Sequence, residues 1–154
     1  MSRTEKRSAA RLAAVQALYQ MELTGAGVLD AAAEFERFWN GKEIDGLSFK
    51  PVEETFFRDL IAGVVREQKT VDRRVDEALA RGWPLKRIET VLRAILRVAA
   101  FELLFRKDVP PRVTISEYVD VARAFYDDDE PGLVNAVLDT LARSDRAEEL
   151  AARH

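Results

Sequence analysis

Hydrophobic side chains recur along most of the chain with the three- and four-residue spacing of an α-helix. The spacing is clearest between Phe56 and Val65, where pairs of apolar residues return every four positions. No segment alternates between apolar and polar residues with the period of two that a half-buried strand requires. The pattern therefore predicts an all-α fold, a compact bundle of about seven helices.

Start and stop signals locate these helices. Ser2 and Glu5 have the spacing of a capping box, and Gly25 offers a stop, so a first helix is expected from about Ser2 to Leu23. The segment 41–50 shows no periodicity and is expected to be a loop. Further helices are expected over about 30–39, from Pro51 to about Gln68, over 71–79 with Thr70 as cap, from Leu85 to Arg106, from a capping box of Thr114 and Glu117 to Phe125, and from Pro131 to a polar tail beginning at Ser144.

The run Arg81-Gly82-Trp83-Pro84 divides this series of helices. The glycine favours a helix end and the proline cannot continue a helix. We expect one domain over 1–145, made of two helical halves of about 1–82 and 83–145, followed by a polar tail over 146–154. The helix from Leu85 to Arg106 is apolar nearly all round, which places it in the centre of the bundle.

Composition excludes several function classes. The 154 residues are 47% hydrophobic and 33% charged, as in a globular protein, and they contain no cysteine and one histidine. Thiolate chemistry is excluded, and neither a phosphate loop nor a zinc motif is present. We expect no enzyme activity, no cofactor and no bound metal. The acidic run 127–130 is interpreted as a helix cap and dipole complement.

A location in the cytoplasm is also expected. The longest charge-free stretch, from Leu12 to Met21, is too short to span a bilayer. No hydrophobic signal core follows the first residues. We therefore expect no membrane segment.

The start of the chain is basic although the net charge is −3. Its cations are spaced so that three arginines form one ridge of the first helix. Cations at a helix N-terminus oppose the helix dipole, by about 0.3–1 kcal/mol each, so an anionic partner such as RNA would account for them. A solvated arm accounts for them equally well. The residues concerned are Arg3, Lys6, Arg7 and Arg11.

Three further side chains each allow a structural and a functional interpretation. Tyr19, two turns after Arg11, is either a core residue with a wet hydroxyl or a stacking surface for an unpaired base, and its spacing favours the core. Arg97 and Glu102 lie in the apolar central helix, where unpaired charges are costly. They either pair with other helices or line a groove for a protein partner.

Five segments, taken in order, resemble the NusB family of transcription antitermination factors. They cover nearly the whole chain. They read A-A-R-L-A-A-V-Q-A-L-Y (9–19), F-F-R-D-L-I-A-G-V (56–64), V-L-R-A-I-L-R-V-A-A-F-E-L (91–103), V-P-P-R-V-T-I-S-E (109–117) and L-V-N-A-V-L-D (133–139).

The resemblance implies a fold of two three-helix-bundle-like halves. It implies that the chain binds the single-stranded boxA element of nascent RNA together with NusE, a ribosomal protein of the small subunit. The complex would join RNA polymerase and the other Nus factors and suppress termination, notably in ribosomal RNA transcription. Recognition of unpaired bases is the usual route to sequence-specific RNA binding.

The family's motifs also imply particular contacts. Asp129 matches an acidic position associated with RNA, where a carboxylate would accept hydrogen bonds from base amines. The protein-partner surface would include Tyr19, Arg97 and Glu102. The remaining RNA-binding positions would be Lys6, Arg7, Arg11, Gln16 and Tyr19.

The sequence departs from the family's pattern at three places. Ser8 and Ala9 replace arginines found in some relatives, which should weaken the salt-dependent part of RNA binding. Leu133 replaces a phenylalanine suited to stacking on a base. Ser116 and Tyr118 replace the commoner asparagine and alanine, and the bulky Tyr118 is expected to alter either packing or a self-association surface.

Two alternatives are set beside the RNA-binding hypothesis. The first is a protein-interaction module or a homodimer whose basic arm is incidental; a homodimer would also hide the RNA surface until NusE arrives. The second is the NusB-like domain of some RNA cytosine methyltransferases. We expect the second not to apply, since the sequence contains no methyl-donor-binding region and no catalytic cysteine.

Overall fold

The computed structural model describes residues 2–40, 43–44, 47–48, 52–79 and 88–151. Its backbone contacts divide the chain into two compact units, Met1–Arg66 and Glu67–His154. Each unit is described by itself.

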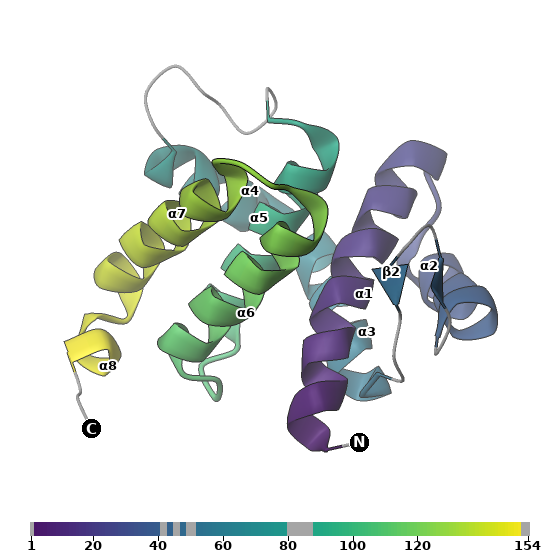
Figure 1. The fold of residues 1–154 in the computed structure, drawn as a ribbon. Helices are drawn as coiled ribbons and strands as arrows, with labels where there is room; N and C mark the ends of the chain where they lie inside the picture. Colours follow the sequence, from purple (N-terminus) through teal and green to yellow (C-terminus); the bar gives the residue numbers. More distant parts are fainter. Residues whose placement is uncertain (1, 41–42, 45–46, 49–51, 80–87, 152–154) are drawn as a thin grey trace. The chain divides into compact units, whose positions relative to one another are not determined.

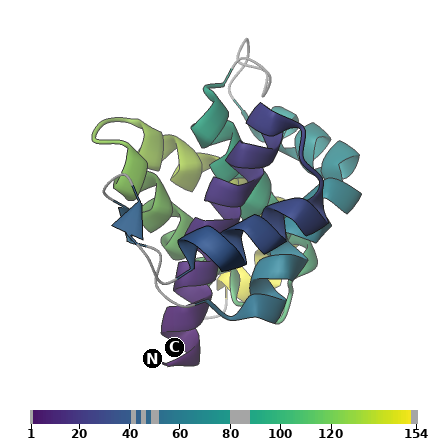
Figure 2. The same cartoon turned by 90° about the vertical axis from the view of Figure 1, so that its right-hand side faces the viewer.

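The first unit is built from three helical segments and one short hairpin (Figure 1). In Figure 2, α2 and the π-helical segment η1 that continues it cross the line of α1. Two-residue antiparallel strands pair Glu43 with Ser48 and Ile44 with Leu47, within a segment expected to be a loop. The elements are α1 (Arg3–Thr24), α2 (Val28–Glu34), η1 (Phe35–Trp39), β1 (Glu43–Ile44), β2 (Leu47–Ser48) and α3 (Glu54–Arg66).

Both ends of α1 follow the predicted signals. The Ser2 side chain accepts a hydrogen bond from the Glu5 backbone N–H, and the Glu5 carboxylate accepts one from the Ser2 backbone N–H. Gly25 ends the helix with a left-handed φ of 75°, a conformation that glycine adopts without steric cost. The capping box and the glycine stop are confirmed.

The core of the first unit pairs large side chains of α3 with small ones of α1. Phe56, Phe57 and the aliphatic side chains of the same α3 face are buried, and the Phe57 ring lies 4.7 Å from that of Phe35. Small side chains allow two packed helices to approach closely. The buried alanines of α1 are Ala10, Ala13, Ala14 and Ala17.

The second unit surrounds one hydrophobic helix. α5 packs against α4, α6 and α7, and α6 packs against α7 (Figure 1). Eleven of the sixteen α5 residues are buried, which confirms the predicted central helix. The elements are α4 (Gln68–Ala78), α5 (Thr90–Phe105), α6 (Pro111–Phe125), α7 (Glu130–Asp145) and α8 (Ala147–Ala151). The all-α prediction is confirmed apart from the short hairpin.

Several predicted helix starts are wrong. α4 begins at Gln68 without a side-chain cap, so Thr70 lies inside it. α5 begins at Thr90, where the Glu89 carboxylate accepts a hydrogen bond from the Val91 N–H at 2.9 Å. α6 begins at Pro111, whose missing N–H is no loss in the first turn, so Thr114 is an interior residue and no cap.

Two more differences lie near the ends of helices. α3 begins at Glu54, and Pro51 lies outside the described residues. The expected division near residue 82 differs from the observed boundary between Arg66 and Glu67, because α4 packs with α5 and α7 of the second unit. The run 81–84 itself lies outside the described residues.

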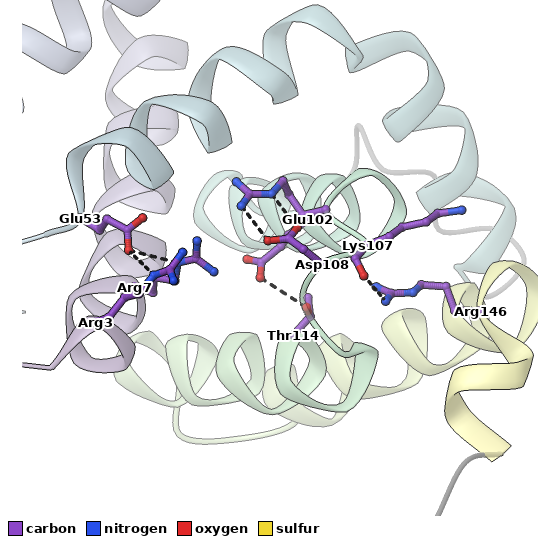
Figure 3. A network of polar contacts seen from close by, with 9 residues as sticks. Arg3, Arg7, Glu53, Glu102, Lys107, Asp108, Thr114 and Arg146 are labelled. Carbon is purple, nitrogen blue, oxygen red and sulfur yellow. Dashed lines mark hydrogen bonds and ion pairs between the residues drawn. The ribbon is translucent and has the colours of Figure 1, made fainter.

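The expected polar tail is partly helical. The Arg146 side chain is buried and donates a hydrogen bond of 3.2 Å to the carbonyl of Lys107 (Figure 3). It donates another of 3.2 Å to the carbonyl of Leu103. It also pairs with Glu149 on α8. Carbonyls at the C-terminal end of a helix lack partners within the helix, so the guanidinium satisfies the Leu103 carbonyl of α5, which would otherwise need water.

A buried carboxylate links α5 to α6. Glu102 is fully buried, and its Oε1 accepts a hydrogen bond of 2.8 Å from the Tyr118 hydroxyl. Its Oε2 accepts a longer one of 3.4 Å from the Thr114 hydroxyl (Figure 3). A carboxylate out of contact with water depends on such donors.

Removal of the Tyr118 hydroxyl tests this dependence. We expect Tyr118→Phe to lower the free energy of unfolding by about 1–3 kcal/mol, because Glu102 loses the 2.8 Å hydrogen bond from the Tyr118 hydroxyl. Tyr126→Phe is the control, since Tyr126 also donates to a carboxylate, that of the exposed Glu89, where water can replace it. The free energies of unfolding of both variants are compared by urea denaturation. Equal losses would contradict the role given to the buried carboxylate.

Candidate nucleic-acid interface

The predicted site residues fall in both units. Lys6, Arg7, Arg11, Gln16 and Tyr19 all lie on α1 in the first unit. Arg97 and Glu102 lie on α5, and Asp129 precedes α7, all in the second unit.

The first turns of α1 carry the exposed cations. Lys6 is exposed, and the side chain of Arg3 is 74% exposed. Charges in water at a helix start are accessible to a phosphate and release counterions when they bind it. Arg3 and Lys6 therefore form the most accessible basic surface of this helix.

Arg7 is held by two groups at the N-terminal end of α3, Glu53 just before the helix and Phe56 within it. Its guanidinium lies 4.5 Å from the centre of the Phe56 ring, which is a cation–π contact. Its Nε donates to Oε2 of Glu53 at 3.2 Å, and Nε of Arg3 donates to the same oxygen at 3.4 Å (Figure 3). The Arg7 side chain is consequently only 17% exposed.

Arg11 is the one cation of the predicted ridge that is buried, at 3% exposure. Its guanidinium lies 5.0 Å from the centre of the Phe56 ring. The direct RNA contact of Arg11 stays a prediction, and in this structure the buried guanidinium supports the packing of α1. Sequence spacing placed Arg3, Arg7 and Arg11 on one ridge but gave no information about the ring beside them.

Farther along α1, Gln16 and Tyr19 are half-buried. Gln16 lines a shallow surface pocket between α1 and the helix that α2 and η1 form, together with Ala17, Gln20, Ala31, Glu34 and Phe35. Gln20 and Glu34 were not among the predicted site residues. The sequence spacing could have identified Gln20, because it follows Gln16 by four residues and so lies on the same helix face.

Asp129 is exposed at the N-terminal end of α7 and makes no capping hydrogen bond through its side chain. The interpretation of the acidic run as a side-chain cap is therefore wrong for Asp129, while Glu130 does lie in the first turn, where the helix dipole favours an acid. The charge of Asp129, and a hydrogen bond with it, raise the pKa of Asp128. Asp129 thus presents negative charge to solvent.

The two charged residues of α5 have partners inside the second unit. Arg97 makes a two-pronged ion pair with Asp72 on α4, with nitrogen to oxygen distances of 2.8 and 3.0 Å. Glu102 is buried with Tyr118. The structure shows these charges paired with other helices of the second unit. The contact of the buried Glu102 with a protein partner stays a prediction.

The burial of Tyr118 decides between the two effects expected of this substitution, altered packing and an altered self-association surface. Its side chain is fully buried beside Glu102, so it alters internal packing and not a self-association surface.

The described residues contain no group of three or more His, Asp or Glu side chains arranged to hold a metal ion. None of their helices is both long enough and apolar enough to cross a membrane.

Comparison with known proteins gives concordant matches. The pattern of the NusB family matches residues 8–143. A protein of Rhodopseudomonas palustris described as "Transcription antitermination protein NusB" is 59% identical over 149 residues, which are 97% of this chain and 86% of that protein.

Two solved structures extend the match to the fold. The structure of T. maritima NusB has a TM-score of 0.75 and 28% identity, covering 95% of this chain and 97% of its own. A crystal structure of antitermination factors NusB and NusE in complex with dsRNA contains a chain with a TM-score of 0.76 and 24% identity, covering 91% of this chain and 98% of its own. At that identity the second match concerns the fold alone.

The fold and the site define an all-helical protein with an accessible basic helix start. The family match, which includes most of the chain, goes further. The chain belongs to the NusB family. The prediction that it is not an enzyme agrees with this membership, because its curated relatives are transcription antitermination proteins.

The ion pairs of Glu53 predict a pH dependence. Partial burial raises the pKa of Glu53, but the hydrogen bonds and charges of Arg7 and Arg3 outweigh this effect and hold the pKa below 4.5. A carboxyl whose pKa is lowered by folding stabilises the folded protein at pH values above its ordinary pKa. This stabilisation is lost as the pH falls through the lowered pKa. We expect an NMR titration of the Glu53 carboxyl to give a midpoint below 4.5.

Arg7→Ala should raise that midpoint, because it removes both a hydrogen bond and a positive charge. Lys69→Ala, which removes an exposed cation of α4, serves as the control. An unchanged midpoint in Arg7→Ala would contradict the pairing.

Proposed function

We propose that this protein is a transcription antitermination factor that binds boxA-type single-stranded RNA together with the ribosomal protein NusE. The complex joins RNA polymerase and other Nus factors, notably during ribosomal RNA transcription. The observation that carries the proposal is the membership in the NusB family over residues 8–143, with relatives named for antitermination at 59% identity. Such a factor acts where RNA is made, so the proposal includes a cytoplasmic location.

The basic start of α1 supplies the electrostatic part of the RNA contact. Lys6 and Arg3 are accessible without rearrangement, and Arg7 contributes when it leaves Glu53. Phosphate contacts give affinity without sequence preference. Arg11 stabilises the helix from inside.

Sequence preference would come from the polar groups beyond these cations. Gln16 and Tyr19 lie farther along α1, and an amide can donate to and accept from base edges while a tyrosine ring can stack on a base. Asp129 is exposed and would accept hydrogen bonds from base amines. As an anion it would repel phosphate, so it would face bases and not the RNA backbone.

NusE is the proposed protein partner. A chain of related fold occurs in a crystal structure described as NusB and NusE in complex with dsRNA, which supports this choice. Tyr19 and Arg97 are the proposed partner contacts, since both retain some exposure, whereas Glu102 acts from within the core by holding α6.

A second candidate function is a protein-interaction module or homodimer. The observation in its favour is the exposure of Leu23 and Leu29, at 60% and 78%, which flank the turn between α1 and α2. A contiguous exposed apolar patch marks a contact with another protein, so this candidate requires the two leucines to contribute to one patch. The molecular mass in solution, with and without NusE, separates a self-associating protein from a monomer.

An RNA titration tests the leading proposal. The protein is titrated with boxA RNA and with a scrambled RNA of the same composition, each with and without NusE and at two salt concentrations. We expect boxA RNA to bind more tightly than the scrambled RNA, and NusE to enlarge the difference. Equal binding of both RNAs under every condition would overturn the specific-RNA proposal.

Lys6→Ala tests the helix start. We expect weaker binding and a plot of log affinity against log salt that is flatter by about 0.7, the contribution of one phosphate contact on a single strand. Lys69→Ala removes the same charge from an exposed position on α4 and should bind like the wild type. If Lys6→Ala and Lys69→Ala have the same slope, Lys6 does not contact phosphate.

A further inference from the structure

One carboxylate faces two cations of the proposed RNA surface. Oε2 of Glu53 accepts hydrogen bonds from the Nε atoms of Arg3 and Arg7, at 3.4 and 3.2 Å (Figure 3). The arginines are four residues apart on α1 and so lie on the same face. A single anion therefore holds two neighbouring cations.

The backbone keeps Glu53 in this position. Its N–H donates to the carbonyl of Lys6 at 3.3 Å, which ties the residue to the first turns of α1. Its own carbonyl accepts a hydrogen bond from the Phe57 N–H at the start of α3. Phe56, three residues along, lies against the Arg7 guanidinium. The carboxylate is thus placed by the fold and does not meet the arginines by chance.

We propose that Glu53 is an intramolecular competitor for RNA phosphate, which occupies Arg3 and Arg7 in the free protein and must release them for full RNA binding. This inference rests on the proposed function of α1 in RNA binding. A carboxylate and a phosphate make the same kind of charge-assisted hydrogen bond with a guanidinium, so the two compete for the same donors.

The exchange is energetically accessible. The Glu53 side chain is 26% exposed and that of Arg3 is 74% exposed, so water reaches the pair and weakens it. An exposed pair of this kind reduces the affinity of a competing anion by about two- to fivefold. Glu53 therefore lowers the affinity for any RNA and leaves most of the discrimination to contacts with bases and with the protein partner.

Glu53→Gln and its neighbour provide a matched test. Glu54→Gln removes the same charge one residue away, on an exposed side chain in the first turn of α3. Both variants reduce the general repulsion of RNA, so the difference between them measures the contact with the arginines. Binding of a boxA-type single-stranded RNA is measured for the wild type and both variants over a range of salt concentrations.

We expect Glu53→Gln to bind the RNA about two- to fivefold more tightly than Glu54→Gln, with a steeper salt dependence because more phosphates are contacted. The added variant Glu53→Gln/Arg7→Ala should lose this gain. In the protein without RNA, NMR should show faster exchange of the Arg7 Nε proton in Glu53→Gln than in the wild type.

The outcomes separate the inference from the proposed function. If the wild type binds no RNA with NusE present, the proposed function fails and the inference fails with it. If the wild type binds and Glu53→Gln equals Glu54→Gln, the inference alone is overturned. Weaker binding by Glu53→Gln would also overturn it, because Glu53 would then position the arginines for RNA.

Discussion

The packing of Phe56 against α1 is the contact on which the first unit depends. The ring is buried, and the guanidinium groups of Arg7 and Arg11 lie near its centre. Partly buried cation–π contacts contribute about 0.5–2 kcal/mol each, more than a solvated arginine gives a helix. One aromatic side chain therefore joins α3 to α1 and decides which basic residues remain accessible to a ligand.

The second unit depends in the same way on polar groups placed within an apolar helix. Glu102 and Arg97 occupy opposite halves of α5, and each is bonded to a neighbouring helix, the first through Tyr118 and the second through Asp72. Hydrophobic burial alone does not specify a rotation of one helix against another, because apolar contacts are not directional. Hydrogen-bonded carboxylates and guanidinium groups are directional, so these pairs specify the positions of α4 and α6 on α5.

Local signals in the sequence were sufficient for much of the fold. The ends of α1 and the buried character of α5 were predicted correctly, because capping residues and apolar periodicity act within one helix. The cap at Thr114 was predicted wrongly, since the proline at position 111 can start the helix earlier and the threonine is needed by Glu102. The family's motifs also gave Arg11 and Lys6 the same predicted role as RNA contacts. The difference between them depends on a ring 45 residues away, which no local pattern contains.

The hydrogen bonds of Arg146 have a consequence for the order in which the second unit gains structure. The guanidinium bonds to carbonyls near the C-terminal end of α5, which come into position only when that helix is complete. α8 has five residues, too few to be stable by itself. The backbone amides of α8 should therefore be protected from hydrogen exchange only while Arg146 is bonded to these carbonyls. Exchange of the α8 amides would report local opening at the C-terminal end of α5 before the whole unit unfolds.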